Sequence, residues 1–161
     1  MFIDSFITSI LHELHSVYGN YLLVAIMTFF LGIATYTDVK SFKIPNKLNF
    51  TMSIIALILI FFDFSFSTLF VKLSGAFVGF FMLFLPAMIK NHAMGGDIKA
   101  VTVIGLFIGV KLIIPFLVLA CLFGSLFIIL RIHKGSLFSV MPFAPFFFIS
   151  HITLFIFSLW I

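Results

Sequence analysis

Residues 112–132 read LIIPFLVLACLFGSLFIILRI, an apolar run whose one charged residue, Arg131, lies next to its end. A helix that crosses the hydrocarbon core of a bilayer needs about 20 consecutive apolar residues, and this run has that length. Its Cys121 is the one cysteine of the chain, so neither a disulfide framework nor a CxxC metal site is expected. The run therefore predicts a membrane-spanning helix in which Cys121 serves as small apolar packing.

The rest of the chain repeats this pattern. Of its 161 residues, 63% are hydrophobic and 9% are charged, and 26 are phenylalanine. A soluble domain carries about 25% charged residues, so the composition excludes that class and predicts an all-α, polytopic membrane protein. We expect about six transmembrane helices, with five as the alternative, because some segments are short. The apolar segments lie at roughly 21–37, 48–62, 68–89, 98–110, 112–132 and 142–161, with a tight turn around Gly109–Lys111.

The first 19 residues have a different pattern. Apolar side chains recur there at helical spacing, and polar ones fall mostly on the opposite face. The segment has no basic leading region and contains Asp4 and Glu13, unlike a cleavable signal peptide. We therefore predict an amphipathic interfacial helix over 1–19, ending near Gly19-Asn20, and a single transmembrane domain over 20–161. The apolar positions are Phe2, Ile3, Phe6, Ile7, Ile10, Leu11, Leu14 and Val17.

The net charge of +4 comes from cations that cluster in short loops, so nucleic acid is not an expected partner and membrane lipids are. Loops rich in lysine and arginine stay in the cytoplasm. We therefore predict a multi-pass protein of the cytoplasmic (inner) membrane with both termini outside. The cations on the predicted inner side are Lys40, Lys43, Lys47, Lys90, Lys99, Arg131 and Lys134, against Lys72 and Lys111 on the outer side.

Two of the five carboxylates, Asp38 and Asp97, stand where an apolar segment meets a loop. The first span would end at Asp38 and the fourth would begin at Asp97, so both acids are expected at the same cytoplasmic depth. Pro45 disfavours helix after Asp38, and Gly95-Gly96 before Asp97 permit unusual backbone and a close approach of substrate. Two facing carboxylates share a proton. One can activate water while the other polarises a peptide carbonyl, which is the chemistry of aspartic proteolysis.

These motifs resemble those of the type IV prepilin peptidases, membrane aspartyl proteases of the Gly-x-Gly-Asp type. An Asp followed by a basic stretch and Ile-Pro-Asn is matched by Asp38 and Ile44-Pro45-Asn46, with Leu48 after it. The second family motif is matched by Gly96-Asp97-Ile98-Lys99. A late Pro-Phe-Gly-Pro segment is echoed by Pro142-Phe143-Ala144-Pro145. The sequence departs from the family at Met94, which replaces the first motif Gly, and at Ala144.

The resemblance implies an aspartic endopeptidase that removes a short basic leader from prepilin or pseudopilin precursors at the cytoplasmic face. Asp38 and Asp97 would be catalytic, with Pro45, Asn46, Gly95, Gly96 and Lys99 as loop or substrate-contacting residues. Many bacterial members carry a cysteine-rich zinc insert associated with methylation, which this chain lacks. We therefore expect a short, protease-only form without metal or other cofactor, serving type IV pili, type II secretion, competence or archaeal filaments.

Two other functions stay open at this point. A small transporter could use Asp38 and Asp97 to carry protons or cations, although transporter sites tend to lie near the bilayer midplane. An inactive relative could bind pilins as an assembly factor, to which the Met94 departure is relevant. His12 and His15 are assigned to the polar face of the first helix, His92 and Asp63 to solvated loops, and His133 to the basic cluster of Arg131 and Lys134 that sets the topology. His151, inside the last span, is expected to make an interhelical hydrogen bond.

Overall fold

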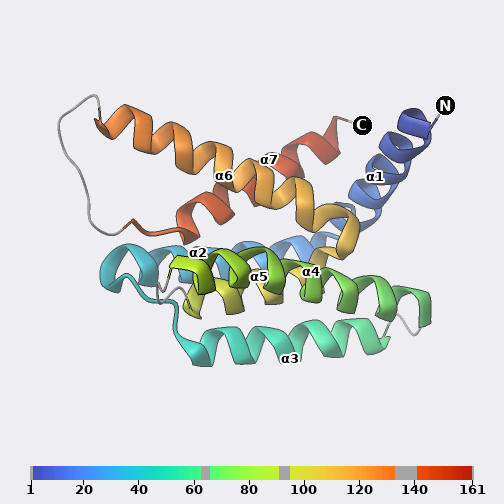
Figure 1. The fold of residues 1–161 in the computed structure, drawn as a ribbon. Coiled ribbons are helices and arrows are strands. Elements are labelled where there is room, and N and C mark those ends of the chain that lie inside the picture. Colours follow the sequence, from blue (N-terminus) through green and yellow to red (C-terminus); the bar gives the residue numbers. More distant parts are fainter. Residues whose placement is uncertain (1, 63–65, 91–94, 133–140, 161) are drawn as a thin grey trace.

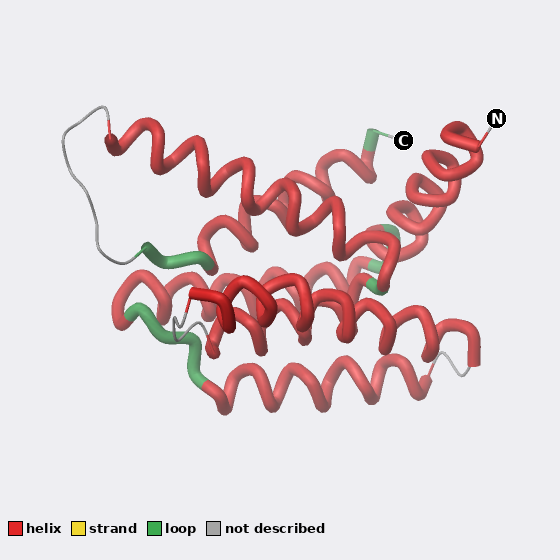
Figure 2. Tube along the Cα trace, viewed as in Figure 1, coloured by secondary structure: helices red, strands yellow, loops and turns green. Residues whose placement is uncertain are grey.

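The computed structural model describes residues 2–62, 66–90, 95–132 and 141–160, and all secondary structure there is helical (Figures 1 and 2). The predictions for Asp63, His92, Met94, His133 and Lys134 lie outside the described residues. The seven helices are α1 (Phe2–Tyr18), α2 (Tyr21–Ser41), α3 (Asn46–Phe62), α4 (Phe66–Lys90), α5 (Gly95–Ile108), α6 (Val110–Ile132) and α7 (Ala144–Leu159).

Helices α2 to α7 occupy the six predicted apolar segments, so the all-α class is confirmed. By length and composition, three described helices can cross a membrane, and they lie within α2, α4 and α6. Helices α3 and α7 are apolar but shorter, with 17 and 16 residues, and α5 has 14. At 1.5 Å per residue, α5 is about 21 Å long, less than the roughly 30 Å hydrocarbon core. Six transmembrane helices are therefore not established.

Helix α5 is the buried centre of the fold. Nine of its 14 residues are buried, from Ile98 to Ile108. It packs against α4 with almost no side chain between them, because Gly75 and Gly105 face each other. A Cβ at Gly75 would lie 2.5 Å from the Gly105 carbonyl oxygen. Small residues allow such close helix packing in membranes. The turn predicted around Gly109 is present, and Gly109 has a φ of 79°, which favours glycine there.

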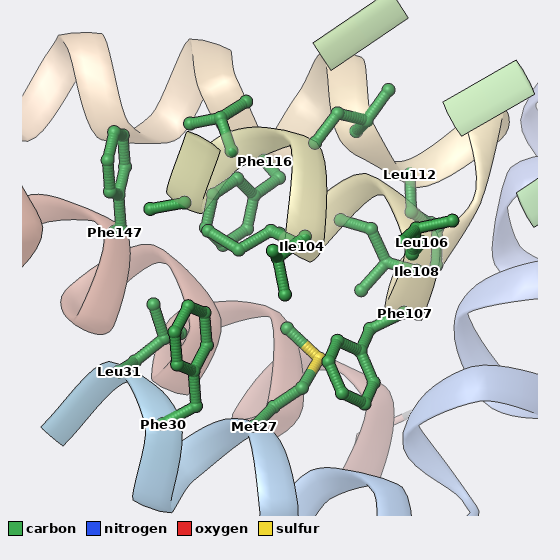
Figure 3. Packing of buried hydrophobic residues seen from close by; sticks show 14 of the residues in the cluster. Met27, Phe30, Leu31, Ile104, Leu106, Phe107, Ile108, Leu112, Phe116 and Phe147 are labelled. Atoms are coloured by element: carbon green, nitrogen blue, oxygen red, sulfur yellow. The ribbon is translucent and has the colours of Figure 1, made fainter. Parts of the chain in front are cut away.

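The main core joins α5 to three other helices, as Figure 3 shows. Met27 of α2 packs toward Phe107 of α5, and Phe30 lies beside Leu31 of the same helix. Phe116 of α6 and Phe147 of α7 lie on the other side of Ile104. All five aromatic and sulfur-bearing side chains are at most 2% exposed. Hydrophobic side chains elsewhere, such as those of α3 and α4, are widely exposed on the outer surface.

Helix α1 ends at Tyr18, as the sequence predicts. Gly19 donates its N–H to the His15 carbonyl at 2.8 Å, and the Asn20 side chain caps α2 by accepting from the Leu23 N–H at 3.2 Å. Leu14 and Val17 are buried, whereas Phe6 and Ile7 toward the free end are exposed. The carboxyl half of the helix is thus docked on the bundle. Its interfacial position stays a prediction, as does the division into 1–19 and 20–161.

Candidate active site

Asp38 lies in the last turn of α2 and is 4% exposed. The helix stops four residues later at Phe42, which adopts a left-handed conformation with a φ of 52°. The Phe42 N–H donates to the Asp38 carbonyl at 2.7 Å and closes the helix end. As the sequence predicts, the chain leaves the helix before Pro45, and residues 42–45 are not helical. The Pro45 carbonyl accepts the Leu48 N–H at 3.1 Å at the start of α3.

The Asp38 side chain is held by a helix far away in sequence. Its Oδ2 accepts the backbone N–H of Ala144, the first residue of α7, at 2.9 Å. The adjacent Phe143 N–H also favours the ionised form of this carboxylate. An anion at the amino end of a helix is stabilised by the helix dipole and by the free N–H groups. Asp38 therefore acts as the missing cap of α7, whose own N-cap residue makes no side-chain capping bond.

Asp97 lies in the first turn of α5, in front of the apolar segment 98–110, and it is half-buried. Its position depends on the glycine before it. The Gly96 Cα faces the backbone of Ile44, and an added Cβ would lie 3.3 Å from the Ile44 nitrogen. Ile44 is 5% exposed, so the loop after α2 is packed under the start of α5.

Two side-chain hydrogen bonds stabilise the packing of the loop after α2 and the start of α3 against the start of α5. The buried Asn49 of α3 donates its Nδ2 to the Gly96 carbonyl at 3.3 Å. Lys99 donates its Nζ to the Asn46 Oδ1 at 2.9 Å, at the exposed edge. The two sequence motifs, one around Asp38 and one around Asp97, therefore form one structural unit.

Both aspartates line one cavity of about 320 Å³ at the end of the bundle where α2 ends and α3, α5 and α7 begin (Figure 1). Burial, and then the neighbouring Asp38 charge, raises the pKa of Asp97 to about 7. A carboxyl group with this pKa can hold a proton at neutral pH and release it during a reaction. The lining residues are Asp38, Phe42, Lys43, Ile44, Asn46, Gly95, Gly96, Asp97 and Lys99.

The structure therefore brings together six of the seven residues that the sequence singled out. Pro45 is the seventh; it is exposed and does not line the cavity. The described residues contain no group of three or more His, Cys, Asp or Glu side chains that could hold a metal ion. Of the histidines, His151 is fully buried and makes the expected interhelical hydrogen bonds, to Thr28 Oγ1 at 3.0 Å and to the Tyr18 hydroxyl at 3.4 Å.

Sequence reasoning missed two residues that build the site. Asn49 was treated as part of an apolar segment, although an amide three residues after Asn46, on the buried face of a helix, is a signal for a buried polar contact. Ala144 was noted as part of the late proline segment without a role. Its contribution is a backbone N–H, and no side-chain pattern reveals the partner of a backbone group.

A comparison with protein-family profiles matches residues 25–129 to the type IV leader peptidase family. The match covers well over half of the chain and includes both aspartates. The chain belongs to this family of membrane-embedded proteases, whose members act on prepilin-like substrates. Neither the search of curated proteins nor the search of solved structures gave a match.

Proposed function

We propose that this type IV leader peptidase is an aspartic endopeptidase that removes a short basic leader from prepilin-like precursors. The observation that carries the proposal is the pairing of Asp38 and Asp97 at one cavity, where Asp97 has a pKa raised to about 7. One ionised and one protonated carboxyl group is the arrangement that activates water for attack on a peptide carbonyl. At about 30 Å³ per water, the cavity has room for water and for a length of extended peptide.

The position of the cavity supports proteolysis over transport. The cavity lies at the ends of helices and is bordered by the loop 42–45, with Lys43, Asn46 and Lys99 around it. A site at a helix end can receive both water and an extended substrate segment. Ion-coupling sites in transporters instead tend to lie near the bilayer midplane on interrupted helices.

The orientation that we propose follows from the lysines. Lys40, Lys43 and Lys47 surround the end of α2 and the start of α3, so this end of the bundle is placed in the cytoplasm. The protein would then be a multi-pass protein of the cytoplasmic membrane with its termini outside. A single cysteine placed at Lys43, in a Cys121→Ser background because Cys121 is exposed, should resist labelling from outside intact cells. Labelling there would contradict the orientation.

The direct test is cleavage by the purified protein in detergent or liposomes. A type IV prepilin-like precursor should be cut once at its leader boundary, as read by mass spectrometry of the new amino terminus. Cleavage should continue in EDTA and leave the amino terminus unmethylated, because the chain has one cysteine and no zinc insert. Absence of cleavage, or loss on chelation with recovery in zinc, would overturn the proposal. A precursor with its boundary residue changed to a bulky one is the matched control.

A further inference from the structure

The amino end of α7 has few backbone donors. The two prolines of the segment 142–145 have no N–H. The N–H groups of Phe146 and Phe147 both donate to the Phe143 carbonyl, at 3.0 and 3.4 Å. Of the first residues of the helix, this leaves the N–H groups of Phe143 and Ala144. A buried backbone N–H requires an acceptor. Because the prolines have no N–H, the groups at this helix start that need an acceptor are those of Phe143 and Ala144.

Both of these donors act on the same carboxylate. The Ala144 N–H donates to Asp38 Oδ2 at 2.9 Å, and the adjacent Phe143 N–H also favours the ionised form of this side chain. Ala144 is 0% exposed and Asp38 is 4% exposed, so water does not compete for this contact. A hydrogen bond to an ionised oxygen is stronger than one between neutral groups, and the helix dipole adds to it.

We propose that the amino end of α7 is a positioning element that keeps Asp38 ionised and aimed into the cavity, so that Asp38 is the base of the pair and Asp97 is the proton carrier. This inference rests on the proposed proteolytic function. Phe143 and Ala144 act through Asp38 and are positioning residues. Their role gives the late proline segment, which lies outside the residues matched to the family, a place in the site.

In the proposed reaction, each carboxyl group transfers one proton in each direction. Asp38 takes a proton from a water molecule as the water oxygen bonds to the peptide carbonyl carbon, and Asp97 gives its proton to the carbonyl oxygen. When the resulting diol collapses, the C–N bond breaks. Asp38 passes its proton to the leaving nitrogen, and Asp97 recovers a proton from a diol hydroxyl. Each carboxyl group then has its starting protonation state.

Other charged groups around Asp38 are the same in any two proteins compared below that differ only at Ala144. Asp97 and Lys99 come from α5, Lys43 comes from the loop 42–45, and the exposed Lys47 comes from α3. Helix α7 contributes one titratable residue, His151, which is bonded in its own buried cluster. Helix α1 packs near the other end of α2. A change at Ala144 therefore removes a donor and leaves these charges in place.

The test measures the titration of Asp38 without substrate. In an Asp97→Asn protein, Asp38 is the one cavity aspartate, and its carboxyl C=O infrared band can be isolated by subtracting the spectrum of the Asp38→Asn/Asp97→Asn protein. Ala144→Pro removes the donor and should raise the midpoint of this titration by about one pH unit or more, because the N–H favours the ionised form. Ala144→Gly retains the N–H and should leave the midpoint unchanged.

A proline at position 144 can also disturb the helix start, so a second variant isolates the hydrogen bond. Replacing Ala144 with L-lactate by nonsense suppression changes the amide to an ester and removes the N–H with the backbone shape retained. In the protein with both aspartates, either variant should shift the acidic limb of the cleavage profile to higher pH and leave the alkaline limb in place.

The result that overturns the inference is an unshifted Asp38 midpoint in the ester variant, whether or not the protein cleaves prepilins. Failure of the proposed function is a different result, namely absence of cleavage by the unmodified protein with the titration shift still observed. A lower cleavage rate at all pH values, with both limbs unmoved, would assign Ala144 a purely structural role and would also overturn the inference.

Discussion

The two aspartates of the cavity stand at the ends of two helices, but they are held in opposite ways. Asp38 is 4% exposed and its carboxylate accepts the backbone N–H of Ala144 at the start of α7. Asp97 is half-buried, and its carboxylate accepts no hydrogen bond from the described part of the chain. Burial and the nearby Asp38 charge act on Asp97 without such compensation. The difference in hydrogen bonding makes two identical side chains chemically distinct.

The supports of the two residues differ as well. Asp38 is fixed by direct bonds to its own carboxylate, so its geometry depends on α7. Asp97 is placed indirectly, by the contact of Gly96 with Ile44 and by the bonds of Asn49 and Lys99. Loss of either carboxylate should therefore abolish most cleavage. Substitutions of the residues that support Asp97 should lower the cleavage rate by smaller, graded amounts.

The largest expected effect is the loss of either carboxylate. Asp38→Asn and Asp97→Asn should each lower cleavage of a prepilin by at least about a hundredfold, because neither amide can act as base or as switchable proton carrier. The double variant should be little worse, since groups that act as a unit are not additive. Cleavage rates in proteoliposomes with matched protein amounts measure this.

Asp63→Asn is the control for these variants, since the sequence places Asp63 at the opposite end of the apolar segments, and it should cleave normally. Substantial cleavage by either single aspartate variant, with expression verified, would contradict the claim that the two aspartates act as one unit. All three variants should insert, because removing a carboxylate lowers the cost of membrane burial.

The next effect is a dependence of cleavage and stability on pH through Asp97. If Asp97 must carry a proton, cleavage should fall as the pH rises through about 7. The unfolded chain loses this proton near its ordinary pKa of about 3.9, whereas the folded protein keeps it to about 7. The unfolded state therefore binds fewer protons between these values, and this group makes the free energy of unfolding fall as pH rises through that window.

Thermal unfolding in detergent, measured as a function of pH, tests the direction of this change in the free energy of unfolding. Asp97→Asn should remove this part of the pH dependence and should raise the unfolding midpoint relative to the unmodified protein above pH 7, by a few degrees. Asp38→Asn should raise it less, because the Asp38 carboxylate accepts the Ala144 N–H and that charge-assisted hydrogen bond is lost. An equal rise in both variants would contradict the distinction between the two residues.

The sequence predicted the helices and the shared end of the site for a simple reason. Runs of apolar residues give helix positions, and the two acids at the ends of the first and fourth runs must meet if the helices alternate in direction. Mean hydropathy cannot tell a lipid-facing helix from a buried one. For that reason α5, 14 residues long and mostly buried, was predicted as an ordinary span.

The contacts that complete the site could not be predicted from the sequence, for a different reason. The hydrogen bonds of Asn49 and Ala144 join positions 47 and 106 residues apart, and both involve a backbone group that every residue possesses. The glycines give a partial signal. Gly75 and Gly105 mark a close helix contact, but the sequence does not pair them.

A smaller effect should come from Gly96→Ala. The new Cβ would lie 3.3 Å from the Ile44 nitrogen and 3.4 Å from its carbonyl oxygen, so the α5 start must shift by a few tenths of an ångström. Such a displacement of Asp97 should lower kcat by about tenfold, since reaction geometry is sensitive to small misplacement. Gly32→Ala in α2 is the matched control: its Cβ meets no described atom within 4 Å, and it should cleave normally. Equal rates for the two variants would show that the Ile44 contact does not position Asp97.

The smallest expected effect is that of Lys99→Met, which removes the bond from Lys99 Nζ to Asn46 Oδ1 and retains most of the side-chain length. This bond lies at the exposed edge of the cavity, where a polar pair contributes about 1 kcal/mol or less. Cleavage should therefore fall by at most about fivefold, with the alkaline limb of the pH profile little changed. Lys111→Met is the control, because it removes a comparable 3.2 Å pair with Glu13 at the other end of the molecule, and it should have no effect on cleavage. A loss of a hundredfold or more in Lys99→Met would mean that Lys99 contacts the substrate or the reacting groups directly. Asp97 would then have a charged partner in the reaction, and the contrast between a bonded Asp38 and an unsupported Asp97 would hold only in the absence of substrate.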